Sequence, residues 1–169
     1  MKSTAFAARH DPGGGSSAAV LQRGESAGLH CNHSRTIGGE YMASIRALIV
    51  DDSAVMRKIV ERSLRQAGIG LDQVLEAGNG SDALDVLRRQ KVDLVLSDIN
   101  MPVMDGLEFV RQLAGVENAR GVPVVMITTE GSESHVVEAI SCGARGYIRK
   151  PFTPEQVKEH VLPLLEPRS

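Results

Sequence analysis

Short apolar runs alternate with amphipathic stretches from Ile45 onward, and this alternation constrains the fold more than any other feature of the chain. The runs are rich in Val, Ile and Leu, and they end at Val50, Ala77, Ser97, Ile127 and Ile148. Continuous apolar runs are typical of parallel strands that are covered on both faces. Between the runs, apolar residues recur at helical spacing. Because crossovers between parallel strands are right-handed, the pattern predicts an α/β fold, a doubly wound parallel sheet of five strands with five helices.

Two of the expected helices carry sequence signals for where they begin. Asp105 and Thr153 are capping residues, and each is followed at the third position by an acid or amide, Glu108 or Gln156. Pro154 suits the first helical position. We therefore expect helices to begin directly after Asp105 and Thr153.

Side chains with useful chemistry follow the ends of the predicted strands. Asp51 and Asp52 close the first apolar run, and Asp98 closes the third. Thr128 follows the fourth run, and Lys150 follows the fifth. The carboxyl ends of the strands in an open α/β sheet share one edge, and ligands bind there. The sequence therefore predicts a single pocket that holds three acids, a hydroxyl and one lysine.

Such a pocket favours a divalent metal and phosphoryl chemistry. Two carboxylates ~4 Å apart repel by about 4 kcal/mol at an effective dielectric of 20, and a hard cation offsets this repulsion. Oxygen ligands with room for water favour Mg²⁺. An aspartate beside Mg²⁺ can act as a nucleophile, which makes Asp98 a candidate, and Lys150 could pair with it. Taken singly, each of these residues is more often an ordinary loop or surface group, so the interpretation rests on their joint placement.

The motifs, taken in order, resemble a known family. They are LIVDDS at 48–53, DINMP at 98–102 followed by Asp105 and Gly106, Thr128, KPF at 150–152, and GARGY at 143–147. On five βα units this set resembles the receiver domain of two-component response regulators, the CheY-like family, from about Arg46 to Leu165. The resemblance implies a flavodoxin-like, CheY-like arrangement of the sheet.

The resemblance also implies a role for each acid. Asp98 would be the phosphoacceptor. Asp52, Asp98 and the backbone carbonyl of Asn100 would bind Mg²⁺, and Asp51 would act through a bound water. Phosphoryl transfer depends on positioning and charge neutralisation more than on covalent machinery, which agrees with this scheme.

Three further residues would respond to the phosphoryl group. Lys150 and the Thr128 hydroxyl would hold its oxygens, and Tyr147 would be an aromatic switch that turns inward as Thr128 moves. Thr129 departs from the family, which favours a small residue there, and this departure bears on how freely Tyr147 swings.

A stand-alone response regulator is the function that the resemblance implies. We expect it to accept a phosphoryl group from a sensor histidine kinase or a phosphotransfer protein, and not to act as an enzyme beyond Mg²⁺-dependent self-phosphorylation and autodephosphorylation. A downstream protein would dock on the fourth helix, fifth strand and fifth helix, around His135, Tyr147 and Lys158. Chemotaxis, a phosphorelay and stress signalling all stay open as pathways.

Two other functions fit the sequence less well. A Mg²⁺-dependent phosphatase could use Asp98 as its nucleophile, but Asn100 stands where such an enzyme needs a second aspartate, and no cap domain is evident. A flavodoxin-type cofactor binder would need a first loop that accepts phosphate, whereas Asp51 and Asp52 would repel it.

Composition argues against nucleic acid and membrane as partners and favours a reducing compartment. A net charge of -2 and a pI near 6.2 give no global basic field for nucleic acid. No apolar stretch approaches the ~20 residues of a membrane span. Cys31 and Cys142 lie far apart without metal-site spacing, so we expect free thiols in a reducing cytoplasm.

The first part of the chain lacks any sustained period of 2 or 3.6. We expect residues 1–41 to be a disordered tail, or sequence upstream of a natural start at Met42, and residues 45–166 to be the receiver domain. His10, His30, Cys31 and His33 could be drawn as a metal site, but a fourth well-spaced ligand and a fold to hold it are missing from the pattern.

Overall fold

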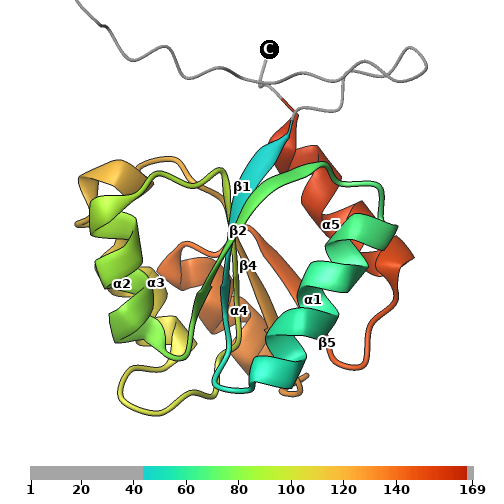
Figure 1. Ribbon diagram of the computed structural model, residues 1–169. Helices are drawn as coiled ribbons and strands as arrows, with labels where there is room; N and C mark the ends of the chain where they lie inside the picture. The colour runs from blue at the N-terminus through green and yellow to red at the C-terminus, as the bar shows by residue number, and fades with distance from the viewer. Residues whose placement is uncertain (1–43, 167–169) are drawn as a thin grey trace, which may run out of the picture. The chain divides into compact units, whose positions relative to one another are not determined.

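The computed structural model describes residues 44–166, and the expectations for residues 1–41 lie outside that part (Figure 1). One parallel sheet of five strands forms its centre, in the order β2-β1-β3-β4-β5. The strands are β1 (Ile45–Val50), β2 (Leu71–Ala77), β3 (Leu94–Ser97), β4 (Val124–Thr128) and β5 (Gly146–Arg149). The chain moves outward from β1 to β2, then returns past β1 and continues to β5. This reversal confirms the predicted doubly wound sheet, and it places β1 and β3 side by side.

Helices cover both faces of the sheet, as Figure 1 shows. They are α1 (Ala54–Gln66), α2 (Gly80–Arg89), α3 (Gly106–Leu113), α4 (Glu133–Cys142) and α5 (Pro154–Leu165), with a short 3-10 turn, η1 (Glu117–Ala119). α1 and α5 pack together on one face, and α2, α3 and α4 follow one another across the other. The loops that carry the predicted site leave the carboxyl ends of the strands, at the bottom of Figure 1.

The burial of the strands explains their continuous apolar sequence. Along β1, Leu48 and Val50 pack toward α2, α3 and α4, while Ala47 and Ile49 pack toward α1 and α5. All residues of β3 and β4 are buried, as expected for inner strands. The core is mainly aliphatic, although the largest fully buried side chain is aromatic, Phe109.

Both predicted helix starts are confirmed. The Asp105 side chain accepts a hydrogen bond from the Glu108 amide at 2.8 Å, and α3 begins at the next residue. Thr153 accepts from the Gln156 amide at 3.3 Å, and the Gln156 side chain accepts from the Thr153 amide at 3.0 Å. This reciprocal pair is a capping box, and it fixes the start of α5 at Pro154, after the loop that follows β5.

Gly106 shows why a glycine follows Asp105. A Cβ at this position would collide with the main-chain oxygen of Asp98, with Ile99 and with Met126. The Gly106 amide donates to the Ile99 carbonyl at 2.8 Å. The start of α3 therefore lies directly against the loop that carries Asp98, and only a residue without a side chain fits there.

Among residues 44–166, the structure has no helix with the length and apolar character that a membrane crossing requires. Cys142, at the end of α4, is a free thiol.

Candidate functional site

Neighbouring strands bring the three predicted acids together. The Asp98 amide donates to the Val50 carbonyl at 2.8 Å, which joins the end of β3 to the end of β1. One carboxylate oxygen from each of Asp51, Asp52 and Asp98 lies within 4.8 Å of the others. The acids thus form one cluster, although Asp51 and Asp98 are separated by almost fifty positions in the sequence.

Lys150 bridges two of these acids from the far end of the chain. Its Nζ lies 2.8 Å from Oδ2 of Asp51 and 3.2 Å from Oδ2 of Asp98. Its side chain is only 10% exposed, and its backbone amide donates to the Thr128 carbonyl at 2.8 Å. The β5–α5 loop therefore holds one ammonium group against two buried carboxylates.

Asp51 is held at every polar atom. Its Oδ1 accepts from the Ser53 amide at 2.9 Å, and its Oδ2 accepts from Lys150. Its amide donates to the Ala77 carbonyl at 3.1 Å, and its main-chain oxygen accepts from Nη1 of Arg57 at 2.7 Å. Because Asp51 is only 4% exposed and all its polar atoms are bonded, its side chain is held in one position at the side of the pocket.

Asp98 and Asp52 differ in burial. Asp98 is 9% exposed, and its Oδ1 accepts from the Ile99 amide at 2.7 Å. Asp52 is exposed, and its carboxylate makes no hydrogen bond or ion pair with any residue between 44 and 166. Asp52 therefore lies at the mouth of the pocket, above the two buried acids.

The donor set of this pocket fits a hard divalent cation. All three clustered side chains offer carboxylate oxygens, and Asn100, exposed beside Asp98, has a main-chain oxygen that accepts no backbone hydrogen bond in the described part of the chain. Three carboxylates face only one ammonium group there, so negative charge is in excess. Oxygen-only ligands with an open side suit Mg²⁺, which keeps several of its waters.

Thr128 and Tyr147 lie on the β4–β5 side of the pocket. Thr128, fully buried at the end of β4, accepts a hydrogen bond at Oγ1 from the Glu130 amide at 3.2 Å. Tyr147 pairs with Met126 across the two strands, and its buried hydroxyl has no hydrogen-bond partner within residues 44–166. Burial raises the pKa of Tyr147, and the nearby charge of Glu130 adds to this effect.

The structure also shows a contributor that the sequence reasoning missed. Arg57 contacts the main chain of Asp51, and its partner on β2 is Glu76, at 2.8 Å from Nε. Neither residue belongs to a quoted motif. The only signal in the sequence was a basic residue in the first turn of the helix that follows the acid pair.

Comparisons with known proteins agree on one family. The family profile of the response regulator receiver domain matches residues 47–162. A CheY homologue of Campylobacter jejuni, named as a chemotaxis protein, is 40% identical over 116 residues, which are 68% of this chain and 88% of the relative. The chemotaxis protein CheY-3 of Vibrio cholerae is 37% identical and covers 73% of this chain and 93% of its own length.

Solved structures give the same result for the fold. The chemotaxis protein CheY4 of Vibrio cholerae superposes with a TM-score of 0.65 at 36% identity, covering 73% of this chain and all of that chain (100%). The receiver domain of a Pseudomonas aeruginosa sensor histidine kinase, solved with a magnesium ion coordinated in its active-site cleft, reaches 0.63 at 27% identity, over 73% of this chain and 98% of that one. The chain therefore belongs to the response regulator receiver domain family, the signalling switches of two-component systems.

Proposed function

We propose that this protein works by accepting a phosphoryl group on Asp98 from a sensor histidine kinase or a phosphotransfer protein, and that this event changes its binding to a downstream protein. The observation that carries the proposal is the Lys150 ammonium group, which lies 2.8 Å from Asp51 and 3.2 Å from Asp98 in an oxygen-rich pocket. An incoming phosphoryl group needs a nucleophilic oxygen and nearby positive charge, and this arrangement offers both.

In the proposed transfer, a carboxylate oxygen of Asp98 attacks the phosphorus of a phosphohistidine. An O–P bond forms and the N–P bond breaks, and its electron pair leaves with the imidazole nitrogen, which then takes a proton. Asp52, Asp98 and the Asn100 carbonyl would hold Mg²⁺, with Asp51 behind a water. When bound, this ion supplies positive charge beside the transferring group. Lys150 turns from the Asp98 carboxylate to an oxygen of the new acyl phosphate.

The β4–β5 side is proposed to respond to the phosphate. The Thr128 hydroxyl now accepts from the Glu130 amide, and it can instead donate to a phosphoryl oxygen. Such a rotation releases the Glu130 amide in the β4–α4 loop, and the charge of Glu130 already acts on Tyr147 by raising its pKa. Hydrolysis would return the domain to its resting state, with water attacking phosphorus and the bond to Asp98 breaking.

A downstream partner is proposed to dock on α4, β5 and α5, around His135, Tyr147 and Lys158. The α4 surface supports this because it carries two exposed apolar side chains, Val137 at 64% and Ile140 at 48%. Neighbouring exposed apolar side chains can mark a protein contact, and Val55 and Ile59 give α1 a second such pair. Since the relatives from Campylobacter jejuni and Vibrio cholerae are chemotaxis proteins, we place chemotaxis first among the pathways.

Labelling with acetyl phosphate and Mg²⁺ tests the phosphoacceptor. We expect mass spectrometry to find one acid-stable, base-labile phosphate on the wild type and none on Asp98→Asn. Asp105→Asn is the matched control, because Asn still caps α3 and this acid lies outside the pocket; it should label fully. Full labelling of Asp98→Asn would refute the assignment, and rapid release of phosphate without accumulated label would favour the phosphatase.

A further inference from the structure

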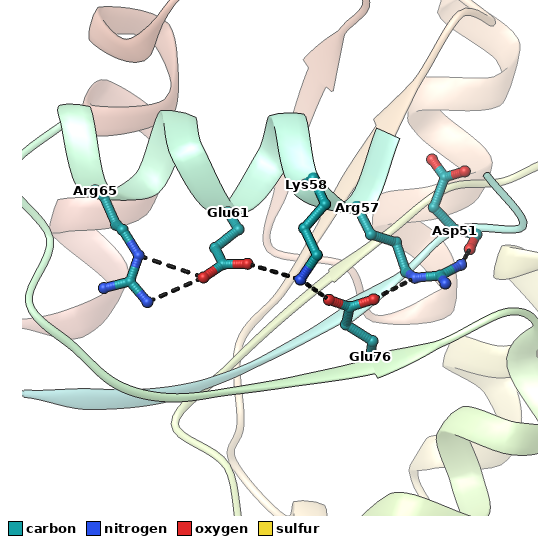
Figure 2. A network of polar contacts seen from close by, with 6 residues as sticks. All are labelled: Asp51, Arg57, Lys58, Glu61, Arg65 and Glu76. Carbon is teal, nitrogen blue, oxygen red and sulfur yellow. Dashed lines mark hydrogen bonds and ion pairs between the residues drawn. The ribbon is translucent and has the colours of Figure 1, made fainter. Parts of the chain in front are cut away.

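Arg57 joins the acid pocket to the outer edge of the sheet. Its Nη1 donates to the main-chain oxygen of Asp51 at 2.7 Å, and its Nε lies 2.8 Å from Oε2 of Glu76 on β2. Figure 2 shows the guanidinium group between these two acceptors, with the Asp51 carboxylate pointing away from it. Arg57 thus bonds the backbone of the acid loop and makes no hydrogen bond or ion pair with the carboxylates of Asp51, Asp52 or Asp98.

Neighbouring charges hold the guanidinium group in this position. The side chain of Arg57 is only 17% exposed. Glu76 also accepts from Lys58 at 2.6 Å, and both cations lower the pKa of Glu76, with the Arg57 bond as the largest cause. Lys58 continues to Glu61 and Arg65 along the outside of α1, as Figure 2 shows. The rigid fork of an arginine can hold two acceptors at once, which a lysine cannot do as well.

The bonded oxygen belongs to the peptide group that links Asp51 to Asp52. Asp51 is also fixed by its own amide and side chain, but the Asp52 carboxylate has no hydrogen bond within residues 44–166. The position of Asp52 therefore depends on the backbone that carries it. A peptide group is planar, so a bond to the Asp51 oxygen fixes the orientation in which the chain enters Asp52.

We propose that Arg57 is a positioning residue for the divalent-cation site: it holds the Asp51–Asp52 peptide so that the Asp52 carboxylate faces Asp51 and Asp98. This inference rests on the proposed function, because it concerns the same cation. Arg57 lies outside the motifs that mark the pocket, at the inner end of the ion-pair network.

The direction in which Mg²⁺ affinity changes when Arg57 is removed distinguishes a positioning role from a purely electrostatic one. Arg57 is a cation near a cation site, so by Coulomb repulsion alone its removal would tighten Mg²⁺ binding. If Arg57 positions Asp52, its removal weakens Mg²⁺ binding instead. Residues that orient metal ligands typically contribute about 10–100-fold to metal affinity, and an effect near the lower end is expected for a bond to the backbone.

Isothermal titration of the full chain with MgCl₂ tests this inference. We expect Arg57→Met to raise the dissociation constant of Mg²⁺ about tenfold, and Arg57→Lys to have a smaller effect in the same direction. Arg65→Met is the matched control, because it removes an arginine from the outer end of the same network without touching Asp51; its Mg²⁺ affinity should equal that of the wild type. Urea unfolding without Mg²⁺ verifies that each variant is folded. If Arg57→Met does not fold, the Mg²⁺ affinity of Arg57→Lys decides the test.

The outcomes distinguish the inference from the proposed function. Unchanged or tighter Mg²⁺ binding by folded Arg57 variants overturns the positioning role and leaves the pocket intact. A wild type that does not bind Mg²⁺, or an Asp52→Ala variant that binds it equally well, overturns the metal site itself and the inference with it. Equal weakening by Arg57→Met and Arg65→Met also overturns the inference, because the loss would then follow the network as a whole.

Discussion

The two sides of the acid pocket are built very differently. On the β1–α1 side, all the polar atoms of Asp51 have partners, and the Ser53 side chain caps α1 by accepting from the Met56 amide at 3.3 Å. α1 also buries Val60, Ser63 and Leu64 against the sheet. This side is therefore held by hydrogen bonds, ion pairs and packing together.

The β4–α4 side has far fewer such contacts. The Thr128 hydroxyl has a single protein partner in the described part of the chain, and the buried Tyr147 hydroxyl has none there. The Ser132 side chain makes no capping bond at the start of α4, and Ala139 is the only residue of that helix that is buried. Local stability falls where buried contacts and caps are few.

The difference suggests separate tasks: the β1–α1 side holds groups in fixed positions, and the β4–α4 side can change its conformation. In the proposed function a cation and a phosphoryl group need ligands that are already in place, and the fixed position of Asp51 on the β1–α1 side suits that need. A switch needs an element with two arrangements of similar energy, and the loosely packed β4–α4 side can supply it.

Lys150→Ala should have the largest effect, because Lys150 is the cation that joins the two sides. Its loss leaves the buried carboxylates of Asp51 and Asp98 unneutralised, which should lower the metal-free free energy of unfolding by about 3 kcal/mol. We expect phosphorylation to persist and partner binding to be lost. Urea titration measures the first effect, with the exposed Lys158→Ala as control. Wild-type partner binding by phosphorylated Lys150→Ala would reduce Lys150 to a structural charge, and wild-type stability would show that the two carboxylates do not need its ammonium group.

Hydrogen exchange compares the two sides directly. Amides of α4 should exchange at least about tenfold faster than those of α1, which corresponds to about 1.4 kcal/mol in opening free energy. The physical reason is the single buried residue of α4 against three in α1. Mass spectrometry of peptides from the two helices would measure this. Equal exchange rates in the two helices would contradict the inference that the β4–α4 side is less stable than the β1–α1 side.

Asp52→Ala should raise metal-free stability by up to about 1 kcal/mol, because it removes one of three mutually repelling charges at an exposed position. Mg²⁺ at about 100 times its dissociation constant should add roughly 2.7 kcal/mol to the wild type and less to the variant. Urea titrations with and without Mg²⁺ would show both effects. Most substitutions destabilise, so a metal-free gain is diagnostic, and a loss would argue against shared repulsion. Asp98→Ala is predicted to behave in the same direction.

Tyr147→Phe should have the smallest effect near neutral pH, within about 0.5 kcal/mol, because the lost hydroxyl has no partner within residues 44–166. The folded pKa of Tyr147 is raised above 10.0, so its contribution to stability is fully present below pH 10 and is lost as pH rises through the folded pKa. Above pH 10 the wild type should therefore lose stability relative to the phenylalanine variant. A loss of several kcal/mol at neutral pH would reveal a hidden partner for the hydroxyl.

Much of this molecule could be predicted from its sequence, for local reasons. Strand burial shows in continuous apolar runs, and the caps at Asp105 and Thr153 act within a few residues of the chain. The contact between the acids and Lys150 followed from topology, since parallel strands end at one edge. The contact of Arg57 with the Asp51 carbonyl could not be predicted, because it depends on a side-chain rotamer and on Glu76 across the sheet.

Two further features could not be predicted from the sequence for a similar reason: the unpartnered hydroxyl of Tyr147 and the hydrogen bond from the Glu130 amide to Thr128. The Glu130 bond depends on the path of the β4–α4 loop, and the state of the Tyr147 hydroxyl depends on its side-chain rotamer; no periodicity in the sequence specifies either. β2 was also less uniform than its apolar run indicated: as an edge strand it exposes Asp72 and Gln73.

The contact between Lys150 and Asp51 spans 99 residues, and this span has a consequence during synthesis. A chain that has left the ribosome as far as β4 already carries all three acids, but the cation that neutralises two of them has not yet been made. Domains generally complete folding as units, so the pocket closes only when β5 and α5 dock. A copy that stops before β5 would therefore carry three clustered carboxylates without the strand, helix and lysine that complete the domain, and we expect it to stay unfolded.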